Sequence, residues 1–369
     1  MTTAISLFIM TGISLLYSNT RNNLRMQADA SFMTENAQFA LDGLEFHLRL
    51  VGHWGGVKDA AVTGLTLAGC SGFAIPSTLV SLQGYAGGAT VPAGPDQCIT
   101  ALADYQRNSD ILVVRYALPD AIFPVDTTLS YSLGALVQTP DITSTQTSPA
   151  TLYRCCTTGI PSTAGTFSAG EWSTLNNAYI VRSLVGKSAQ ILQTSGTGQL
   201  TIPATLPMDR YNTTNHMFKV EIFFIRPCSD QGANGVCDAT DDNGAPIPTL
   251  VSYSLQDDGT MIQQAVVDGI EMMKLIYGVD TDGDGVPNQY VTAANVSNWS
   301  QVVTVQISLV MRSQDFNDRY ANLYQQSFSM AGGYTFVPAT DSATSATAHI
   351  KSYKRIMFTK VVQLRNRIY

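Results

Sequence analysis

One short loop carries residues whose types and spacing suit a calcium ion. They occupy positions 1, 3, 5, 7 and 9 of the loop: Asp280, Asp282, Asp284, Val286 and Asn288. Calcium takes about six to eight oxygen ligands, and this order is the first half of an EF-hand loop, in which position 7 offers its carbonyl. The twelfth position is Val291, so the usual glutamate is absent. The sequence predicts a Ca²⁺ site completed by water or by a carboxylate from elsewhere; the alternative is a turn rich in Asp and Gly without an ion.

The cysteines favour disulfides over a metal site. There are six: Cys70, Cys98, Cys155, Cys156, Cys228 and Cys237. None forms a Cys-x-x-Cys pair, and only four histidines are present, which argues against zinc. An even number favours disulfides formed in an oxidising compartment. Cys70 and Cys98 bracket one turn-rich loop and Cys228 and Cys237 another, whereas the adjacent Cys155 and Cys156 could bond each other or separate partners. Sequence alone leaves the pairing open.

No sequence pattern indicates catalysis or nucleic-acid binding. The chain has no Gly-x-Ser-x-Gly nucleophile motif and no phosphate-binding Gly-Lys-Ser/Thr loop. Its net charge of −7 argues against nonspecific nucleic-acid binding, because a phosphate backbone requires a basic surface. Charged residues make up 13% of the chain, about half the usual share, so the surface must be mainly uncharged and polar. We therefore expect an exported protein that is not an enzyme.

The first 52 residues predict one continuous helix. No proline interrupts this stretch. Residues from about 1 to 18 form an apolar part suited to a membrane or to the core of a filament, with these side chains: Ala4, Ile5, Leu7, Phe8, Ile9, Ile13, Leu15 and Leu16. The uncharged run at 4–17 is shorter than the roughly 20 residues of a full span. From about 19 to 52 the pattern is amphipathic, with Leu24, Phe39 and Phe46 among its apolar residues. The alternative is a membrane anchor followed by an amphipathic linker.

Residues 53–369 predict a β-rich head. Apolar or alternating runs bounded by turn residues indicate strands at 111–117, 179–184, 218–226, 250–255, 302–312 and 353–364. The stretch from 52 to about 100 predicts a long loop rich in Gly, Ala and Pro. A long helix followed by antiparallel strands predicts an α+β fold, with the helix packed on the sheet and large loop insertions in the head.

Several segments in order resemble one family. Residues 265–313 contain AVVDGIEMMKLIYGVDTDGDGVPNQYVTA and SNWSQVVTVQISLVMRS, and the chain ends in FTKVVQLRNRIY. These segments resemble PilW-type minor pilins, in which a Val-x-Gly-Ile/Val-Glu helix leads to a Tyr-Gly-Val-Asp-Thr-Asp loop, a Trp and a Val-x-Ile-x-Leu strand. The segment FFIRPCSD at 223–230 resembles an internal strand of the same family, and the residues at 18–21, 35–41 and 49–52 resemble its helix. The resemblance implies a pilin-like fold.

The N-terminus departs from this family. Type IV pilins begin with a short basic leader, a Gly before the cleavage site and a Phe-Thr-Leu-Ile-Glu-like mature start, and none of these is present here. Met1 aligns a few residues inside the helix of such a pilin. We expect either a start site placed too late or a trimmed N-terminus. The glutamate that these pilins use inside the membrane has no counterpart in this sequence.

The resemblance also implies a function. A PilW-type protein would be a minor pilin of the priming or tip complex of a type IV pilus, acting in pilus assembly, twitching motility and adhesion. Its partners would be other minor pilins and the major pilin, through the helix, and a PilY-type tip adhesin. It would lie in the inner membrane of a Gram-negative bacterium with a periplasmic head, and then in the extracellular pilus. The alternatives are a type II secretion pseudopilin and a membrane-anchored, calcium-binding surface adhesin or hydrolase.

Overall fold

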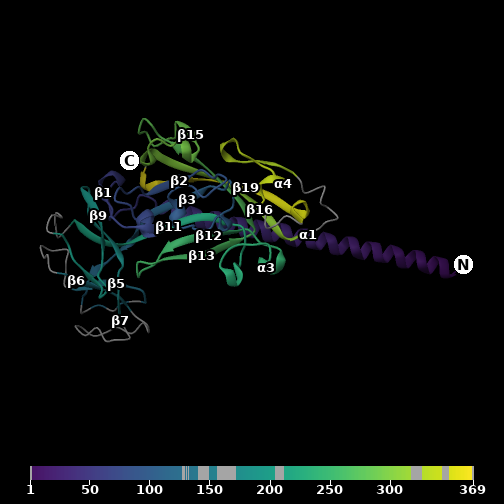
Figure 1. Cartoon of the computed structure of the whole chain (residues 1–369), viewed down its shortest axis with the longest axis horizontal. Helices are drawn as coiled ribbons and strands as arrows, with labels where there is room; N and C mark the ends of the chain where they lie inside the picture. Colours follow the sequence, from purple (N-terminus) through teal and green to yellow (C-terminus); the bar gives the residue numbers. More distant parts are fainter. Residues whose placement is uncertain are drawn as a thin grey trace.

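The computed structural model has one long N-terminal helix and a body of mostly antiparallel sheets, so the predicted α+β class is confirmed (Figure 1). It describes residues 2–126, 129, 131, 133–139, 149–155, 172–203, 212–316, 326–342 and 349–367, without the side chains of residues 2–9 and 60. In Figure 1 the helix projects well beyond the sheets, and the N-terminus lies at its far tip.

The long helix α1 runs without interruption from Thr2–Leu50. Its 49 residues span about 74 Å at about 1.5 Å per residue. It ends at Leu50, and Gly52 just beyond it has a φ of +77°, in the left-handed region that glycine adopts without strain. The side-chain amide of Asn366 donates to the carbonyl oxygens of Arg49 (3.0 Å) and Val51 (3.2 Å). The C-terminal segment of the chain therefore satisfies backbone carbonyls that the helix leaves free at its end.

The second half of α1 packs one face on the sheets. Its buried residues recur at helical spacing: Met33, Ala37, Ala40, Leu41, Leu44 and Leu48. The helix contacts strands β3 (Ile111–Ala121), β13 (Met261–Asp268), β16 (Val302–Phe316) and β19 (Tyr353–Gln363). Phe39 and Phe46 belong to the amphipathic pattern but lie on the opposite side, 64% and 60% exposed. This half therefore has one buried face, and two of its aromatic side chains are exposed rather than packed.

The largest sheet in the described part of the chain has eight strands and is centred on β11. The strand β11 pairs with β3, β8 and β12, all antiparallel. The strands of this sheet are β1 (Val62–Thr63), β2 (Leu82–Tyr85), β3 (Ile111–Ala121), β8 (Tyr179–Leu184), β9 (Ser188–Gln193), β11 (Thr213–Arg226), β12 (Thr249–Leu255) and β13 (Met261–Asp268). In this otherwise antiparallel sheet, β1 pairs with β9 in the parallel direction.

A second sheet, order β15-β14-β16-β19, carries the rest of the surface on which α1 lies. Its strands are β14 (Ile270–Val279), β15 (Gln289–Val291), β16 (Val302–Phe316) and β19 (Tyr353–Gln363). A smaller sheet contains β4 (Phe123–Pro124), β5 (Leu136–Thr139), β6 (Ala150–Cys155), β7 (Trp172–Thr174) and β10 (Gln199–Leu200). A short hairpin joins β17 (Phe328–Ser329) and β18 (Thr335–Phe336). The remaining α-helices are short: α2 (Gly69–Ala74), α3 (Asp241–Gly244) and α4 (Pro338–Asp341).

The main hydrophobic core is shared by α1 and both large sheets. Leu44 and Leu48 of the helix belong to the same cluster as Phe223 of β11 and Ile307 of β16. A separate hydrophobic cluster contains residues of the eight-stranded sheet and of the segment 54–105. Trp54 is one of the residues that this segment contributes. Burial of this kind of apolar area stabilises the fold by roughly 25 cal/mol per Å². The half of α1 that is held by this shared core is therefore fixed relative to the sheets.

The segment that follows α1 is more structured than the predicted loop. It contains β1, α2 and β2, and the disulfide between Cys70 and Cys98 closes its central part. The guanidinium of Arg115 on β3 is fully buried and donates to the carbonyl oxygens of Phe73, Ala74 and Val80. These three bonds hold the segment on the sheet.

The secondary structure predicted for the start of the 265–313 segment was wrong. The family layout implied a helix there, whereas the structure has the end of β13 and the whole of β14. Gly269 lies between these strands with φ +88°, and an added Cβ would stand 3.0 Å from the carbonyl oxygen of Arg312. The chain passes from one large sheet to the other at this glycine, which a helix would not allow.

Candidate functional site

The calcium loop, defined as residues 280–288, connects β14 to β15 in a hairpin. The strands pair up to Val279 and Gln289, and Asn288 N–H donates to the carbonyl oxygen of Val279 at 2.9 Å. The backbone N–H of Asp280 donates to the carbonyl oxygen of Gln301, also at 2.9 Å. The hairpin and the 3₁₀ turn η6 (Trp299–Gln301) thus fix the loop at both ends.

The three carboxylates of the loop converge. One oxygen from each of Asp280, Asp282 and Asp284 lies within 4.8 Å of the others. Asp280 is buried and accepts from the backbone N–H groups of Gly283 (2.6 Å) and Gly285 (2.7 Å). Burial would raise the pKa of Asp280, but these hydrogen bonds outweigh it and hold the pKa below its usual value. Asp280 is therefore an anion that organises the turn.

The residues fit a hard divalent cation in type and in placement. Three carboxylates so close together repel one another, and a cation among them would remove that cost. Gly283 (φ +81°) and Gly285 (φ +84°) provide the bends that bring the side chains to one point. The three carboxylates would be ligands, and water would complete the coordination.

Asn288 and Val286, the other two predicted ligands, make their own hydrogen bonds within the loop. The side-chain oxygen of Asn288 accepts from the backbone N–H of Thr281 at 2.6 Å, and its amide nitrogen donates to Asp282 at 3.1 Å. The amide oxygen is therefore engaged within the loop. The Val286 N–H donates to Asp284 at 2.8 Å, and its side chain is exposed.

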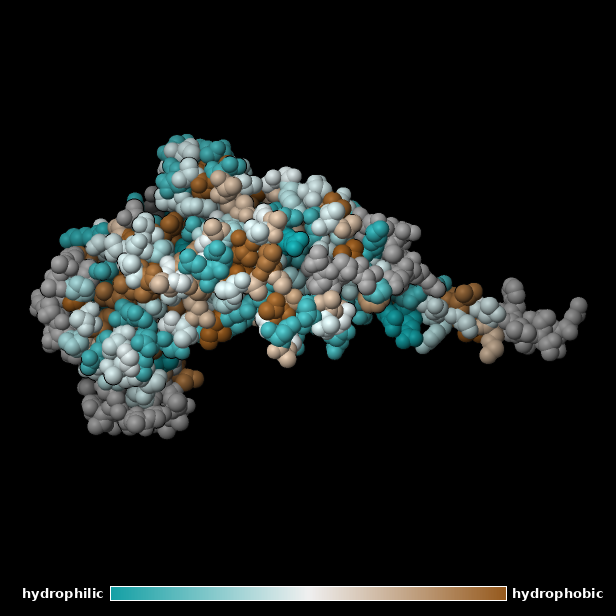
Figure 2. Space-filling model, viewed as in Figure 1, coloured by the Kyte–Doolittle hydropathy of each residue, from teal (hydrophilic) through white to brown (hydrophobic). Residues whose placement is uncertain are grey.

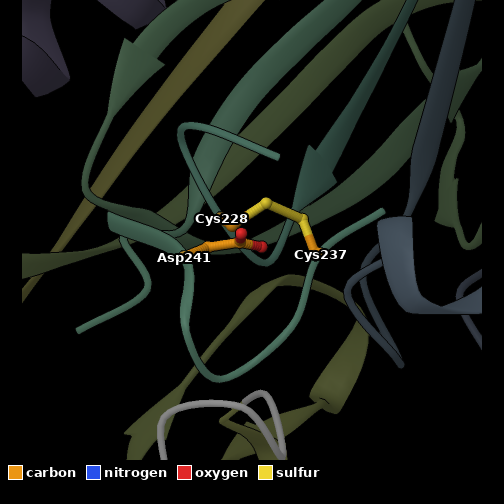
Figure 3. A group of neighbouring side chains, drawn as sticks. All are labelled: Cys228, Cys237 and Asp241. Atoms are coloured by element: carbon orange, nitrogen blue, oxygen red, sulfur yellow. A yellow bond between two sulfur atoms is a disulfide. The ribbon is translucent and has the colours of Figure 1, made fainter. Parts of the chain in front are cut away.

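A second group of ligand-type residues is structural. Cys228, Cys237 and Asp241 lie together, but the two sulfur atoms form a disulfide, so neither is a thiolate that could bind metal (Figure 3). Asp241 accepts from the backbone N–H of Asp238 at 2.6 Å. Of the other cysteines, Cys155 is disulfide-bonded and Cys156 lies outside the described residues.

The first half of α1 projects from the sheets with apolar side chains exposed. Its side chains from residue 10 to 20 are all exposed, including Met10, Ile13, Leu15, Leu16 and Tyr17. Figure 2 shows hydrophobic residues on the projecting part of the helix. The side chains of Ala4, Ile5, Leu7, Phe8 and Ile9 lie outside the described ones. Within the described residues, no helix has an apolar stretch long enough to cross a membrane.

Comparison with known proteins matches residues 236–366 to the family model of PilW, Type IV Pilus-assembly protein W. The chain carries a PilW-family region. The PilW resemblance is thereby confirmed over these residues, and the match relates the chain to type IV pilus assembly. No curated protein and no solved structure gives a significant match. The PilW family points to the bacterial envelope or pilus and to other pilus components as partners, and it is a family of pilus-assembly proteins rather than of known enzymes.

The PilW region contains the calcium loop and the four-stranded sheet that holds α1. It also contains a buried ion pair that the sequence did not reveal. Glu271 on β14 and Arg355 on β19 are each 1% exposed at the side chain, with Glu271 Oε2 2.6 Å from Arg355 Nε. The Ser342 hydroxyl donates to Glu271 Oε1 at 2.5 Å. Burial alone would raise the pKa of Glu271, but Arg355 and then Arg312 more than offset it, so the pKa is lowered.

Proposed function

We propose that this protein is a minor pilin, a structural and non-catalytic subunit of the priming or tip complex of a type IV pilus. The apolar first half of α1 would lie in the inner membrane before assembly and among the helices of sister pilins afterwards. The head would face the periplasm and then the outside of the pilus.

The observation that carries this proposal is the division of α1 into two halves. One half is packed into a core shared by two sheets, and the other projects with its apolar side chains exposed. A helix that is apolar on an unpartnered surface requires lipid or another apolar surface. The PilW match over 236–366 makes pilus subunits the fitting partners.

Deletion of the gene from its source bacterium tests the proposal. We expect strong loss of surface pili and of twitching motility, with recovery when the wild-type gene is returned. Pilus counts by electron microscopy and twitching-zone diameters are the measurements. A deletion strain with normal piliation and normal twitching would rule out this function.

We also propose that the calcium loop binds Ca²⁺ and stabilises the head. The convergence of Asp280, Asp282 and Asp284, two of them exposed, supports this proposal because an ion would relieve their mutual repulsion. A ligand that binds the folded state alone stabilises it in proportion to the logarithm of its concentration.

We therefore expect Ca²⁺ to raise the melting temperature of the purified protein, and Asp282→Ala to abolish this rise. Asp258→Ala is the matched control, because Asp258 is an exposed turn carboxylate whose side chain caps Thr260 outside the loop. The measurement is thermal unfolding with excess EDTA and with millimolar CaCl₂. If the wild-type melting temperature is the same in both buffers, the loop is only a turn.

A further inference from the structure

A cavity of about 650 Å³ opens at the end of α1, away from the projecting half of the helix. Its walls come from the segment that follows the helix (52–59), from η6 and from the C-terminal 3₁₀ turn η10 (Arg365–Arg367). This volume lies within the range of about 300–1,000 Å³ that is typical of pockets for small ligands. The PilW match assigns no role to this cavity, and the proposed assembly through α1 does not involve it.

The acidic group of the cavity is already neutralised. Asp59 accepts from the indole N–H of Trp54 (2.5 Å) and the hydroxyl of Ser81 (2.5 Å), and it pairs with Arg367 at 2.6 Å. Arg367 is itself 5% exposed at the side chain, and it also donates to the carbonyl oxygens of Trp299 and Val302. The Asp59–Arg367 ion pair therefore adds no net charge to the lining of the cavity.

The wall of the cavity carries uncommitted hydrogen-bond donors. The Lys58 ammonium is exposed and has no ion-pair partner in the described part of the chain. Three successive backbone N–H groups, those of Gly56, Val57 and Lys58, donate to no acceptor among the described residues. Gly55 (φ +63°) and Gly56 (φ +84°) turn this stretch sharply. Successive N–H groups in a turn form concave sites that suit anions, and a nearby ammonium strengthens them.

The charge of the wall matches a carboxylate better than a phosphate. Lys58 supplies one uncompensated positive charge, and the terminal guanidinium nitrogens of Arg367 are occupied by Asp59, Ser81 and two carbonyl oxygens. A dianionic phosphate would leave one charge unpaired, whereas a carboxylate would not. Val57 and the buried Trp54 add apolar surface beside these donors, which suits the body of the ligand.

We propose that this cavity binds a carboxylate group with a small apolar body, held by Lys58 and the adjacent backbone N–H groups. Two sources share this chemistry: the free C-terminus of a peptide and a small organic acid in solution. Backbone N–H groups are a known means of capturing a terminal carboxylate.

The test is calorimetric titration of the purified full chain. The probes are an acetylated Ala-Ala-Val peptide with a free C-terminus, the same peptide with an amidated C-terminus, and isovalerate, a small monocarboxylate with an apolar body. Two charge-removing variants are compared with the wild type: Lys58→Gln in the cavity wall, and Lys351→Gln as the matched control. Lys351 is an exposed lysine that does not line the cavity.

We expect the free-acid peptide or isovalerate to bind, the amidated peptide to bind at least tenfold more weakly, and Lys58→Gln to reduce affinity at least fivefold. Lys351→Gln should leave the affinity unchanged. Binding of the free-acid peptide alone identifies a peptide terminus as the source, and equal binding of isovalerate identifies small acids. No binding by either acid, equal binding of the acid and amide peptides, or equal effects of the two variants would overturn the proposal. Because the titration uses the purified chain without other pilus subunits, its result is independent of the proposed pilus function.

Discussion

Replacing both Ile13 and Leu16 by aspartate is expected to reduce surface pili at least tenfold while leaving the melting temperature of the head unchanged. These side chains are 61% and 68% exposed and lie on the half of α1 that projects from the sheets. Their replacement removes no contact from the core, so folding should be unaffected. Two charges placed in lipid or between apolar helices would each cost several kcal/mol, roughly 2.5–3.5 kcal/mol per charge at the centre of a membrane.

The measurements for this double variant are pilus counts in the complemented deletion strain and thermal unfolding of the purified protein. Ile262→Asp is the control, because Ile262 is an exposed apolar residue on β13, away from the projecting half of α1. It should leave piliation near wild type. Wild-type piliation of the double variant would show that the projecting apolar surface is not used in assembly.

Glu271→Gln is expected to lower the free energy of unfolding by about 3–5 kcal/mol, because it leaves buried positive charge without a counter-ion. The amide keeps the shape of the side chain, but Arg355 loses its ion-pair partner and the fully buried Arg312 loses a neighbouring negative charge. Asp42→Asn makes the same chemical change in an exposed pair with Lys360 and should cost less than about 1 kcal/mol. Urea unfolding of both variants gives the comparison, and equal losses would contradict the argument.

The same variant has an expected pH dependence. The folded-state pKa of Glu271 is lowered, whereas an unfolded glutamate titrates near about 4.3. The stabilisation by Glu271 is therefore fully present above the unfolded pKa, and it is lost as the pH falls through the folded pKa. The stability difference between wild type and Glu271→Gln should thus be constant at neutral pH and shrink on strong acidification.

The long-range architecture followed from local sequence patterns where those patterns were strong. The absence of proline predicted the single helix, and all six predicted strands lie within or largely within β3, β8, β11, β12, β16 and β19. The strand β14 was missed because both of its faces are buried, so its residues do not alternate. The exposure of Phe39 and Phe46 was missed for a related reason, since hydrophobicity alone does not say which of two apolar faces meets the sheets.

The candidate sites also divide into those that a local sequence pattern predicts and those that only the fold brings together. The convergence of the three carboxylates in residues 280–288 was predictable because they are two residues apart in one turn, although the bonding of Asn288 to Thr281 was not. Glu271 and Arg355 are 84 residues apart and meet only through the pairing of β14 and β19 with β16. The cavity joins residues near 55 to residues near 367, and no local pattern marks such a site.

The most direct test of the account is photo-crosslinking in piliated cells from a photo-reactive amino acid placed at Leu16. We expect covalent adducts with the major pilin or another pilus subunit, because this exposed position would lie among neighbouring helices. The same probe at Ile262 should give none of these adducts. If Leu16 yields no adduct with any pilus subunit while the protein is present in its folded form, the projecting half of α1 does not pack into the pilus.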